Sequence, residues 1–155
     1  MHKENEKDAK FMQNEKTASA SDLSDLNILL VDDVEANRMI VKVLLAKTNI
    51  VVDEAGSGEA ALDMFAKSPE GHYDAVFMDI QMPDMDGFET TRRLRELPRK
   101  DVRKTPVIAM TADAYEDLDE SGRADMNGYL PKPIDVDEMK KLLIAVVGNR
   151  LAAAR

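Results

Sequence analysis

The sequence of 155 residues contains no cysteine and no tryptophan, and aromatic residues make up only 5% of it. Without cysteine, a disulfide framework, a thiolate nucleophile, an iron-sulfur cluster and a Cys-ligated zinc site are all excluded. The chain also lacks an apolar run of roughly 20 residues, which a membrane-spanning helix needs, and an apolar block near its start of the kind found in secretion signals. We therefore expect a soluble, cytoplasmic protein that does not insert into a membrane.

Basic residues are outnumbered by acidic ones, 21 against 30, which gives a net charge of −9. This charge disfavours nucleic acid as a partner, because a polyanion is bound by basic surfaces. Hydrophobic residues (44%) and charged residues (33%) are balanced as in folded soluble domains, and the length suits one domain. We therefore look for one folded unit with one functional site.

Short apolar runs alternate with segments of helical periodicity from Asn27 onwards. The runs predict strands at Asn27–Val31, Ile50–Val52, Tyr73–Met78, Val107–Met110 and Gly128–Leu130. The last helix, with Gly148 as its predicted end, carries apolar residues at helical spacing: Met139, Leu142, Leu143, Val146 and Val147. Because parallel strands need crossover connections, five strand and helix pairs predict a doubly wound α/β domain with helices on both faces of a parallel sheet.

The pattern also predicts where the domain begins and ends. Residues 1–25 mix Lys, Glu, Asp, Asn, Ser and Ala without an apolar period, which is typical of a flexible extension or linker. We expect the folded domain over residues 26–148 and a short tail over 149–155. Eight residues after Val147 are too few for a helix-turn-helix output domain, so we expect the domain to work through protein contacts, alone or as part of a larger protein.

A basic stretch stands out in this acidic chain between the third and fourth strands. No aromatic residues interleave it, which argues against a nucleic-acid patch and favours a solvated helix face and loop. Its members are Arg92, Arg93, Arg95, Arg99, Lys100, Arg103 and Lys104.

Polar side chains follow four of the five predicted strands. In open α/β sheets, ligands bind beyond the carboxyl ends of the strands. Three carboxylates gathered there repel one another unless they share a proton or a divalent cation, and an all-oxygen site suits Mg²⁺, with Mn²⁺ as an alternative. A cation beside a carboxylate, a hydroxyl and a lysine is the equipment of phosphoryl transfer. The residues are Asp32 and Asp33, Asp79, Thr111 and Lys132.

The motifs ILLVDD, VFMDIQMPDMDG, VIAMTA and YLPKP occur in this order. Together they resemble the receiver (response regulator) domain of two-component phosphorelay signalling, over about residues 26–147. The resemblance implies a flavodoxin-like, five-stranded sheet of order 2-1-3-4-5 with five flanking helices. The stretches at residues 33–38 and 128–135 resemble the receivers associated with hybrid sensor kinases.

The resemblance also implies a role for each site residue. Asp79 would be the phosphoacceptor, and Asp32, Asp33 and Asp79 would hold Mg²⁺ together with the Gln81 backbone carbonyl. Thr111 would hydrogen-bond the phosphoryl group and Lys132 would pair with it. Tyr129 occupies the position of the family's aromatic switch, and a cis peptide bond is expected between Lys132 and Pro133.

A receiver of this kind is a switch and not a metabolic enzyme, with self-catalysed phosphotransfer and autodephosphorylation as its only chemistry. The resemblance implies a histidine kinase or a histidine phosphotransfer protein as phosphodonor and a downstream protein as the reader of the phosphorylated state. Neither His2 nor His72 has a setting that suggests a donor within the chain.

Two other functions fit parts of the sequence. Asp84-Met85-Asp86-Gly87 resembles the DxD motif of haloacid-dehalogenase-like phosphatases, which also form an aspartyl-phosphate intermediate. In that family, however, the first Asp ends a strand, whereas Asp84 follows Pro83 in a predicted loop. A pseudo-receiver that acts without phosphate is the second alternative, and it is disfavoured because all the expected site residues are present.

Overall fold

The computed structural model describes residue 23 and residues 25–154, and side chains as far as residue 148. The predicted extension over residues 1–25 therefore lies, except for residues 23 and 25, outside the described residues. The side chains of the predicted tail, residues 149–155, also lie outside them.

Five parallel strands form one sheet with the order β2-β1-β3-β4-β5, which confirms the predicted topology. The strands are β1 (Asn27–Val31), β2 (Val51–Ala55), β3 (Ala75–Asp79), β4 (Val107–Thr111) and β5 (Gly128–Pro131). Their register aligns Asp79 with Met110 and Thr111 with Pro131, so the carboxyl ends of the strands reach one edge of the sheet together.

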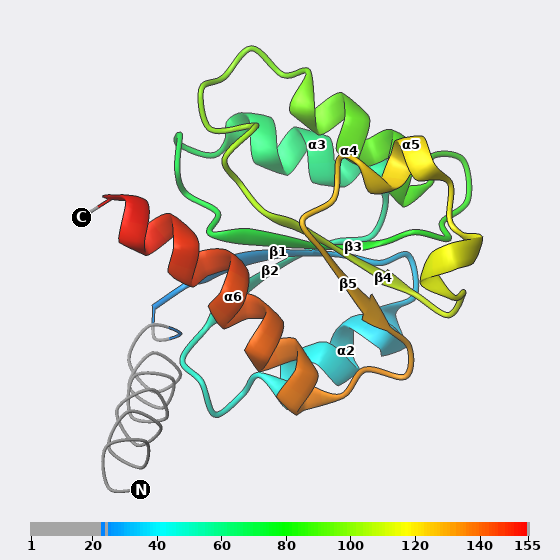
Figure 1. Ribbon diagram of the computed structural model, residues 1–155, viewed down its shortest axis with the longest axis horizontal. Coiled ribbons are helices and arrows are strands. Elements are labelled where there is room, and N and C mark those ends of the chain that lie inside the picture. Colours follow the sequence, from blue (N-terminus) through cyan, green and yellow to red (C-terminus); the bar gives the residue numbers. More distant parts are fainter. Residues whose placement is uncertain (1–22, 24, 155) are drawn as a thin grey trace, which may run out of the picture.

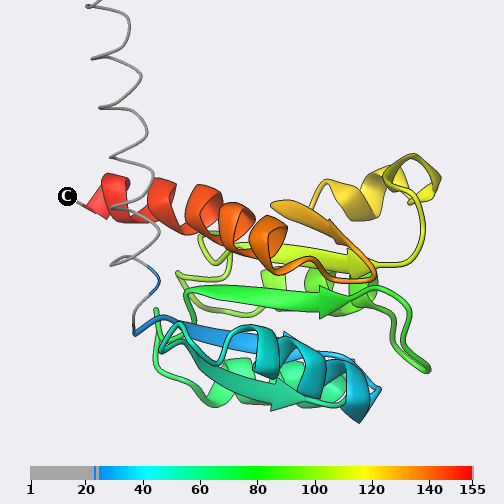
Figure 2. The same cartoon turned by 90° about the horizontal axis from the view of Figure 1, so that it is seen from below.

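The helices cover both faces of the sheet (Figures 1 and 2). Helices α2 (Glu35–Leu44) and α6 (Val136–Ala154) lie on one face, and α3 (Gly58–Lys67), α4 (Gly87–Arg95) and the short α5 (Glu120–Arg123) lie on the other. The weakly periodic stretch after β4 forms a 3₁₀ turn, η1 (Tyr115–Asp117), and then α5. Its low periodicity is explained by the shortness of both elements, which bury little apolar surface.

Strand residues alternate between two hydrophobic cores because successive side chains point to opposite faces of a sheet. Ile28 and Leu30 of β1 pack in the core beneath α2 and α6, where they meet Met139. Leu29 and Val31 pack in the core beneath α3 and α4. These four of the five β1 residues are fully buried, which is why they form an unbroken apolar run in the sequence.

The predicted helix end at Gly148 was wrong, because α6 continues to Ala154. A glycine that ends a helix usually adopts a positive φ, and among the described glycines only Gly71 does so. The Ala-rich residues that follow favour helix, and their propensity outweighs the cost of about 1 kcal/mol for one interior glycine relative to alanine.

Candidate functional site

Three carboxylates meet at the carboxyl edge of the sheet. One oxygen from each of Asp32, Asp33 and Asp79 lies within 4.8 Å of the others. Asp32 and Asp79 are buried, with 1% and 3% of their surface exposed, whereas Asp33 is exposed. The sequence placed these residues at strand ends, and the parallel register is what brings them together.

The backbone around Asp32 and Asp79 is fixed by the sheet. The Asp32 N–H donates to the Ala55 carbonyl (3.1 Å), and the Asp32 carboxylate accepts from the Val34 N–H (2.9 Å). Behind Asp79, the chain passes so closely that a Cβ at Gly87 would lie 2.3 Å from the Asp79 carbonyl oxygen. Only glycine fits there, which explains why the DxDG segment ends in this residue.

Lys132 bridges the two buried carboxylates. Its Nζ lies 3.2 Å from Asp79 Oδ1 and 3.3 Å from Asp32 Oδ2. The Lys132 N–H donates to the Thr111 carbonyl (2.8 Å), which ties this residue to the end of β4, and the peptide bond to Pro133 is cis. Burial opposes the charge of Lys132, but the two carboxylates more than compensate and raise the pKa of its amine.

The surroundings of Asp79 disfavour the charged form of its carboxylate. Burial and the nearby charge of Asp32 raise the pKa of Asp79 to about 6, although Lys132 and the Gln81 N–H oppose the shift. Burial is the larger of the two causes, and the Lys132 ammonium does not fully offset it together with the Asp32 charge. The site is poised for a further positive charge.

Thr111 is buried at the end of β4, and its hydroxyl accepts a hydrogen bond from the Asp113 N–H (3.0 Å). Asp113 in turn accepts from the Gln81 side-chain amide (2.6 Å). This contact joins the loop after β3 to the loop after β4 across the site. The sequence analysis considered only the Gln81 backbone carbonyl, because loop side chains carry no periodic signal from which such a pair can be read.

Tyr129 on β5 is half-buried, and its hydroxyl donates to the Asp113 carbonyl in a short hydrogen bond. Its ring meets that of Tyr115 edge to face, with centroids 5.3 Å apart. Burial and the charges of Asp113, Glu116 and Asp117 raise the pKa of its hydroxyl. The tyrosine thus contacts the loop that follows Thr111.

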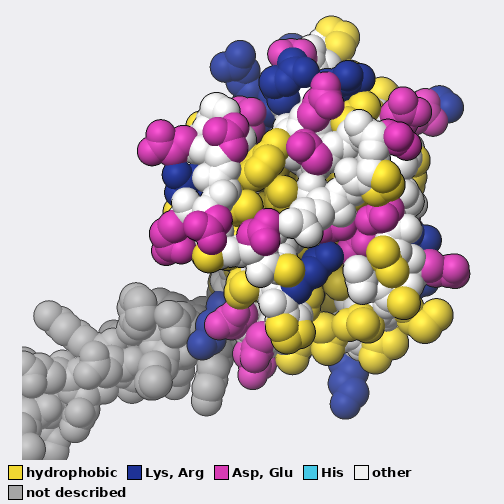
Figure 3. Space-filling view, turned by 90° about the vertical axis from the view of Figure 1, so that its right-hand side faces the viewer, with side chains coloured by type: hydrophobic (Ala, Val, Ile, Leu, Met, Phe, Trp, Pro, Cys, Tyr) yellow, Lys and Arg dark blue, Asp and Glu magenta, His cyan; other side chains and the backbone are white. Residues whose placement is uncertain are grey.

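Acidic side chains are spread over the face of the molecule that the strands' carboxyl ends reach (Figure 3). Hydrophobic side chains gather along its lower border. Val34, next in sequence to Asp33, is exposed, as are three apolar residues of α2: Met39, Ile40 and Val43. An exposed apolar surface of this kind often marks a protein contact.

Asp84 and Asp86 have other roles than those of a phosphatase motif. Asp84 lies in the loop after β3 with φ 68°, and Asp86 caps α4 by accepting from the Glu89 N–H (2.8 Å). Neither residue ends a strand, so the geometry does not support the phosphatase alternative.

Comparison with known protein families identifies the fold. A family model described as the response regulator receiver domain matches residues 28–144. The aerobic respiration control sensor protein ArcB of Escherichia coli is 39% identical over 122 residues, a match that covers 78% of this chain and 15% of that protein. Hybrid signal transduction histidine kinase L of Dictyostelium discoideum is 38% identical over 118 residues, with 75% of this chain and 7% of that protein covered. The chain thus spans a small part of the length of these relatives.

Solved structures give the same picture. The receiver domain of a sensor histidine kinase from Pseudomonas aeruginosa, described with a magnesium ion coordinated in its active site cleft, is 30% identical with a TM-score of 0.71, covering 81% of this chain and 99% of that one. Chemotaxis protein CheY4 of Vibrio cholerae is 27% identical with a TM-score of 0.71, covering 79% of this chain and 99% of that one. Within the described part of the chain, no helix has the length and apolar character to cross a membrane.

Proposed function

Since this chain belongs to the response regulator receiver family of two-component signalling, we propose that it is a phosphorylation-dependent switch in which Asp79 accepts a phosphoryl group from a partner phosphohistidine. The reaction depends on Mg²⁺, and the output is a changed surface that a downstream protein reads. The observation that carries this proposal is the cluster of Asp32, Asp33 and Asp79 with Lys132 between its two buried members.

The donor set fits Mg²⁺. All three side chains offer carboxylate oxygens, the ligands that Mg²⁺ prefers, and these oxygens lie within 4.8 Å of one another. Asp32, Asp33, Asp79 and the Gln81 carbonyl would hold the ion, with Mn²⁺ as a substitute. The bound cation would supply neutralisation of charge on the phosphoryl oxygens.

Asp79 is the nucleophile of the proposed step. One of its carboxylate oxygens attacks phosphorus in line, a new P–O bond forms, and the P–N bond to the donor imidazole breaks with its electron pair leaving on nitrogen. Lys132 loses part of its pairing with Asp79 and follows the incoming phosphoryl oxygens. Without a cation, burial and Asp32 raise the pKa of Asp79 to about 6, so a bound cation would favour the ionised, nucleophilic form of this carboxylate.

The phosphoryl group then acts on the neighbouring loop. The Thr111 hydroxyl turns from the Asp113 N–H towards the new oxygens, and the loop that Tyr129 contacts moves with it. Tyr129 would then change its exposure on the surface made by α5, β5 and α6. This surface is where we place the downstream protein.

The phosphodonor is a histidine kinase or a histidine phosphotransfer protein. Support comes from relatives that include hybrid signal transduction histidine kinase L, and from the apolar surface beside Asp33, which suits a protein better than a small donor. The chemistry of the receiver chain itself would be confined to self-catalysed phosphotransfer and autodephosphorylation. We place this chemistry in the cytoplasm, without nucleic acid as a partner.

The test is intact-protein mass spectrometry after incubation with acetyl phosphate, with and without Mg²⁺. We expect a single Mg²⁺-dependent addition of about 80 Da, the mass of one phosphoryl group, that is absent from Asp79→Asn. Asp84→Asn is the matched control, because Asp84 is an exposed carboxylate of the same loop. Labelling of Asp79→Asn would refute the phosphoacceptor assignment. No addition from acetyl phosphate or from a phosphorylated histidine phosphotransfer protein would favour the pseudo-receiver.

A further inference from the structure

Arg38 makes two directed contacts beside the acidic cluster. Its Nη1 donates to the Asp32 backbone carbonyl at 2.8 Å, and its Nε donates to Glu54 of β2 at 3.2 Å. Only 17% of the Arg38 side chain is exposed. The guanidinium thus joins the edge strand of the sheet to the loop that carries Asp32 and Asp33.

The position of this arginine is not explained by the needs of its helix. Arg38 lies in the first turn of α2, where the helix dipole disfavours a positive charge. Val34, at the N-cap, makes no side-chain hydrogen bond to the described helix, so the start of α2 has no ordinary cap either. The contacts of Arg38 are instead directed at the loop before the helix.

We propose that Arg38 is a positioning residue of the metal pocket, which holds the Asp32 carbonyl and thereby sets the direction of the Asp33 carboxylate. This inference rests on the proposed function. A planar peptide bond links the Asp32 carbonyl to Asp33, so fixing the carbonyl oxygen fixes the plane from which Asp33 leaves.

Asp33 needs such external positioning. Its carboxylate is exposed and accepts no hydrogen bond within the described part of the chain, whereas the Asp32 carboxylate accepts from Val34 and lies 3.3 Å from the Lys132 amine. The direction of the Asp33 carboxylate therefore depends on the conformation of its backbone. Partners that orient a metal ligand typically matter about 10- to 100-fold for metal affinity.

Glu54 orients the arginine in turn. Its second carboxylate oxygen accepts from Lys42 at 3.0 Å, and hydrogen bonds and charge from Lys42 and Arg38 lower the pKa of Glu54. Lys42 shares Glu54 with Arg38 but, within the described part of the chain, forms no hydrogen bond or ion pair with Asp32, and its side chain is 49% exposed. Lys42 is therefore a matched control that carries the same charge and has the same acidic partner.

A positioning role and a purely electrostatic role predict opposite signs. A positive charge near the pocket repels Mg²⁺, so removal of that charge alone would tighten Mg²⁺ binding. Loss of the anchor on the Asp32 carbonyl would instead weaken binding. Arg38→Lys keeps the charge but cannot make both contacts in the geometry of the planar guanidinium, so it separates the two effects.

The experiment is calorimetric titration of the full chain with MgCl₂, at a temperature where circular dichroism shows every variant folded. We expect Arg38→Gln and Arg38→Lys to bind Mg²⁺ about tenfold more weakly than the original chain, and Lys42→Gln to change the affinity by less than about twofold. Amide hydrogen exchange without metal is the second readout. Exchange at Val34, whose N–H donates to the Asp32 carboxylate, should be faster in both Arg38 variants and unchanged in Lys42→Gln.

Unchanged or tighter Mg²⁺ binding in both Arg38 variants would overturn the positioning role while leaving the proposed function intact. If Arg38→Gln does not fold, Arg38→Lys decides alone. Failure of the original chain itself to bind Mg²⁺ would overturn the metal requirement of the proposed function, and the positioning role with it.

Discussion

Two buried aspartates of this protein have opposite electrostatic situations. Asp79 and Asp101 are 3% and 8% exposed, and each has a basic side chain within hydrogen-bond distance. Burial and Asp32 raise the pKa of Asp79 to about 6. Burial also acts to raise the pKa of Asp101, but hydrogen bonds from Arg99 and the Gly71 N–H outweigh it and hold that pKa below its ordinary value.

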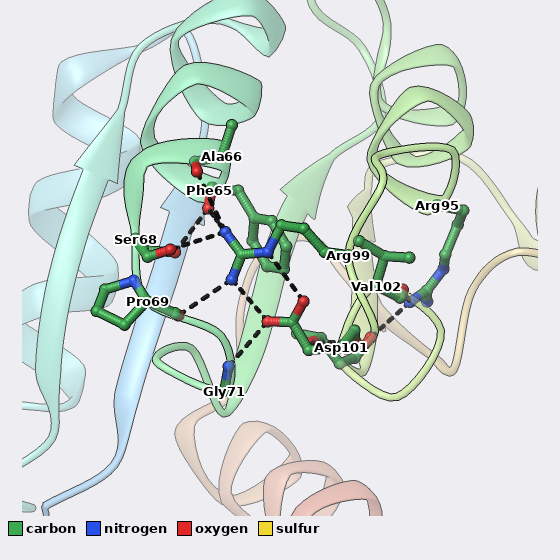
Figure 4. A network of polar contacts seen from close by, with 10 residues as sticks. Phe65, Ala66, Ser68, Pro69, Gly71, Arg95, Arg99, Asp101 and Val102 are labelled. Atoms are coloured by element: carbon green, nitrogen blue, oxygen red, sulfur yellow. Dashed lines mark hydrogen bonds and ion pairs between the residues drawn. The ribbon is translucent and has the colours of Figure 1, made fainter.

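The difference comes from how completely each carboxylate is hydrogen-bonded. Both Asp101 oxygens accept from Arg99, at 3.0 and 2.8 Å, and Oδ2 also accepts from the Gly71 N–H at 2.9 Å (Figure 4). Asp79 has Lys132 at 3.2 Å and a long bond of 3.4 Å from the Gln81 N–H, with the Asp32 charge close by. A satisfied carboxylate serves the structure, whereas an unsatisfied one is available for a ligand.

Arg99 also completes the end of a helix. Its guanidinium donates to carbonyls at the end of α3 and in the following turn, among them Ser68 (2.8 Å) and Pro69 (3.0 Å), and it lies 4.8 Å above the centre of the Phe65 ring (Figure 4). The prediction that the whole basic stretch forms a solvated face was therefore wrong for Arg99. It was also wrong for half-buried Arg95, which donates to carbonyls that include Thr105 (2.7 Å).

The largest expected effect is that of Arg99→Ala. It leaves the buried Asp101 charge uncompensated, so we expect the free energy of unfolding to fall by about 3–5 kcal/mol. Urea unfolding measures this loss. Arg93→Ala, at an exposed position of α4, is the control. A loss below about 1 kcal/mol for Arg99→Ala would show that the hydrogen bonds between Arg99 and Asp101 contribute little to stability, contrary to the structural role assigned to Asp101.

The two aspartates should give opposite pH dependences without Mg²⁺. The pKa of Asp79 is raised from 3.8 to about 6, so its protonated form stabilises the folded state below pH 4. That contribution is lost as pH rises through 6 and amounts to at most about 3 kcal/mol. The pKa of Asp101 is lowered, so its contribution is present above pH 4 and is lost as pH falls further.

The measurement is the free energy of unfolding of the original chain minus that of each Asp→Asn variant, between pH 3 and pH 7.5. The difference should fall with rising pH for Asp79→Asn and increase with rising pH for Asp101→Asn. Slopes of the same sign would remove the distinction between the two sites.

Mg²⁺ should stabilise the folded protein through the Asp79 site and not through the contacts of Asp101. At a concentration of 100 times its dissociation constant, a ligand of the folded state raises the free energy of unfolding by about 2.7 kcal/mol. We expect this gain in the original chain and in Arg99→Ala, and a much smaller gain in Asp79→Asn. Thermal unfolding with and without MgCl₂ checks it, and an equal gain in all three proteins would place the ion elsewhere.

The smallest effect should come from exposed ion pairs. Arg92 and Arg93 contact Glu89 and Glu96 at helical spacing on α4, with roughly half of each arginine side chain exposed. Solvent screening limits such pairs to about 0.3–0.5 kcal/mol each. Arg92→Gln should therefore leave the unfolding midpoint in urea almost unchanged. A large shift would show that exposed ion pairs contribute as much to stability as the buried contact between Arg99 and Asp101.

Much of the fold could be predicted because local patterns of apolar residues indicate the strands and helices. The unbroken apolar run of β1 and the helical spacing in α6 each reflect burial that the sequence records residue by residue. Helix ends and loop contacts were less accessible. Gly148 was read as the end of α6 although helix propensity continues beyond it, and the Gln81–Asp113 contact joins two loops 32 residues apart.

The sequence by itself determined the types of residue at the carboxyl ends of four strands: the carboxylates, the hydroxyl and the lysine, because strand ends follow from apolar runs. Only the tertiary structure decided which carboxylate is strained and which is satisfied. Asp79 and Asp101 are the same residue type, and their pKa values differ because burial, Asp32 and Lys132 act on one and Arg99 and Gly71 act on the other. Arg99 is only two residues from Asp101, but Gly71 lies 30 residues from Asp101 and Lys132 lies 53 residues from Asp79, so the balance of these effects exists only once the chain has folded.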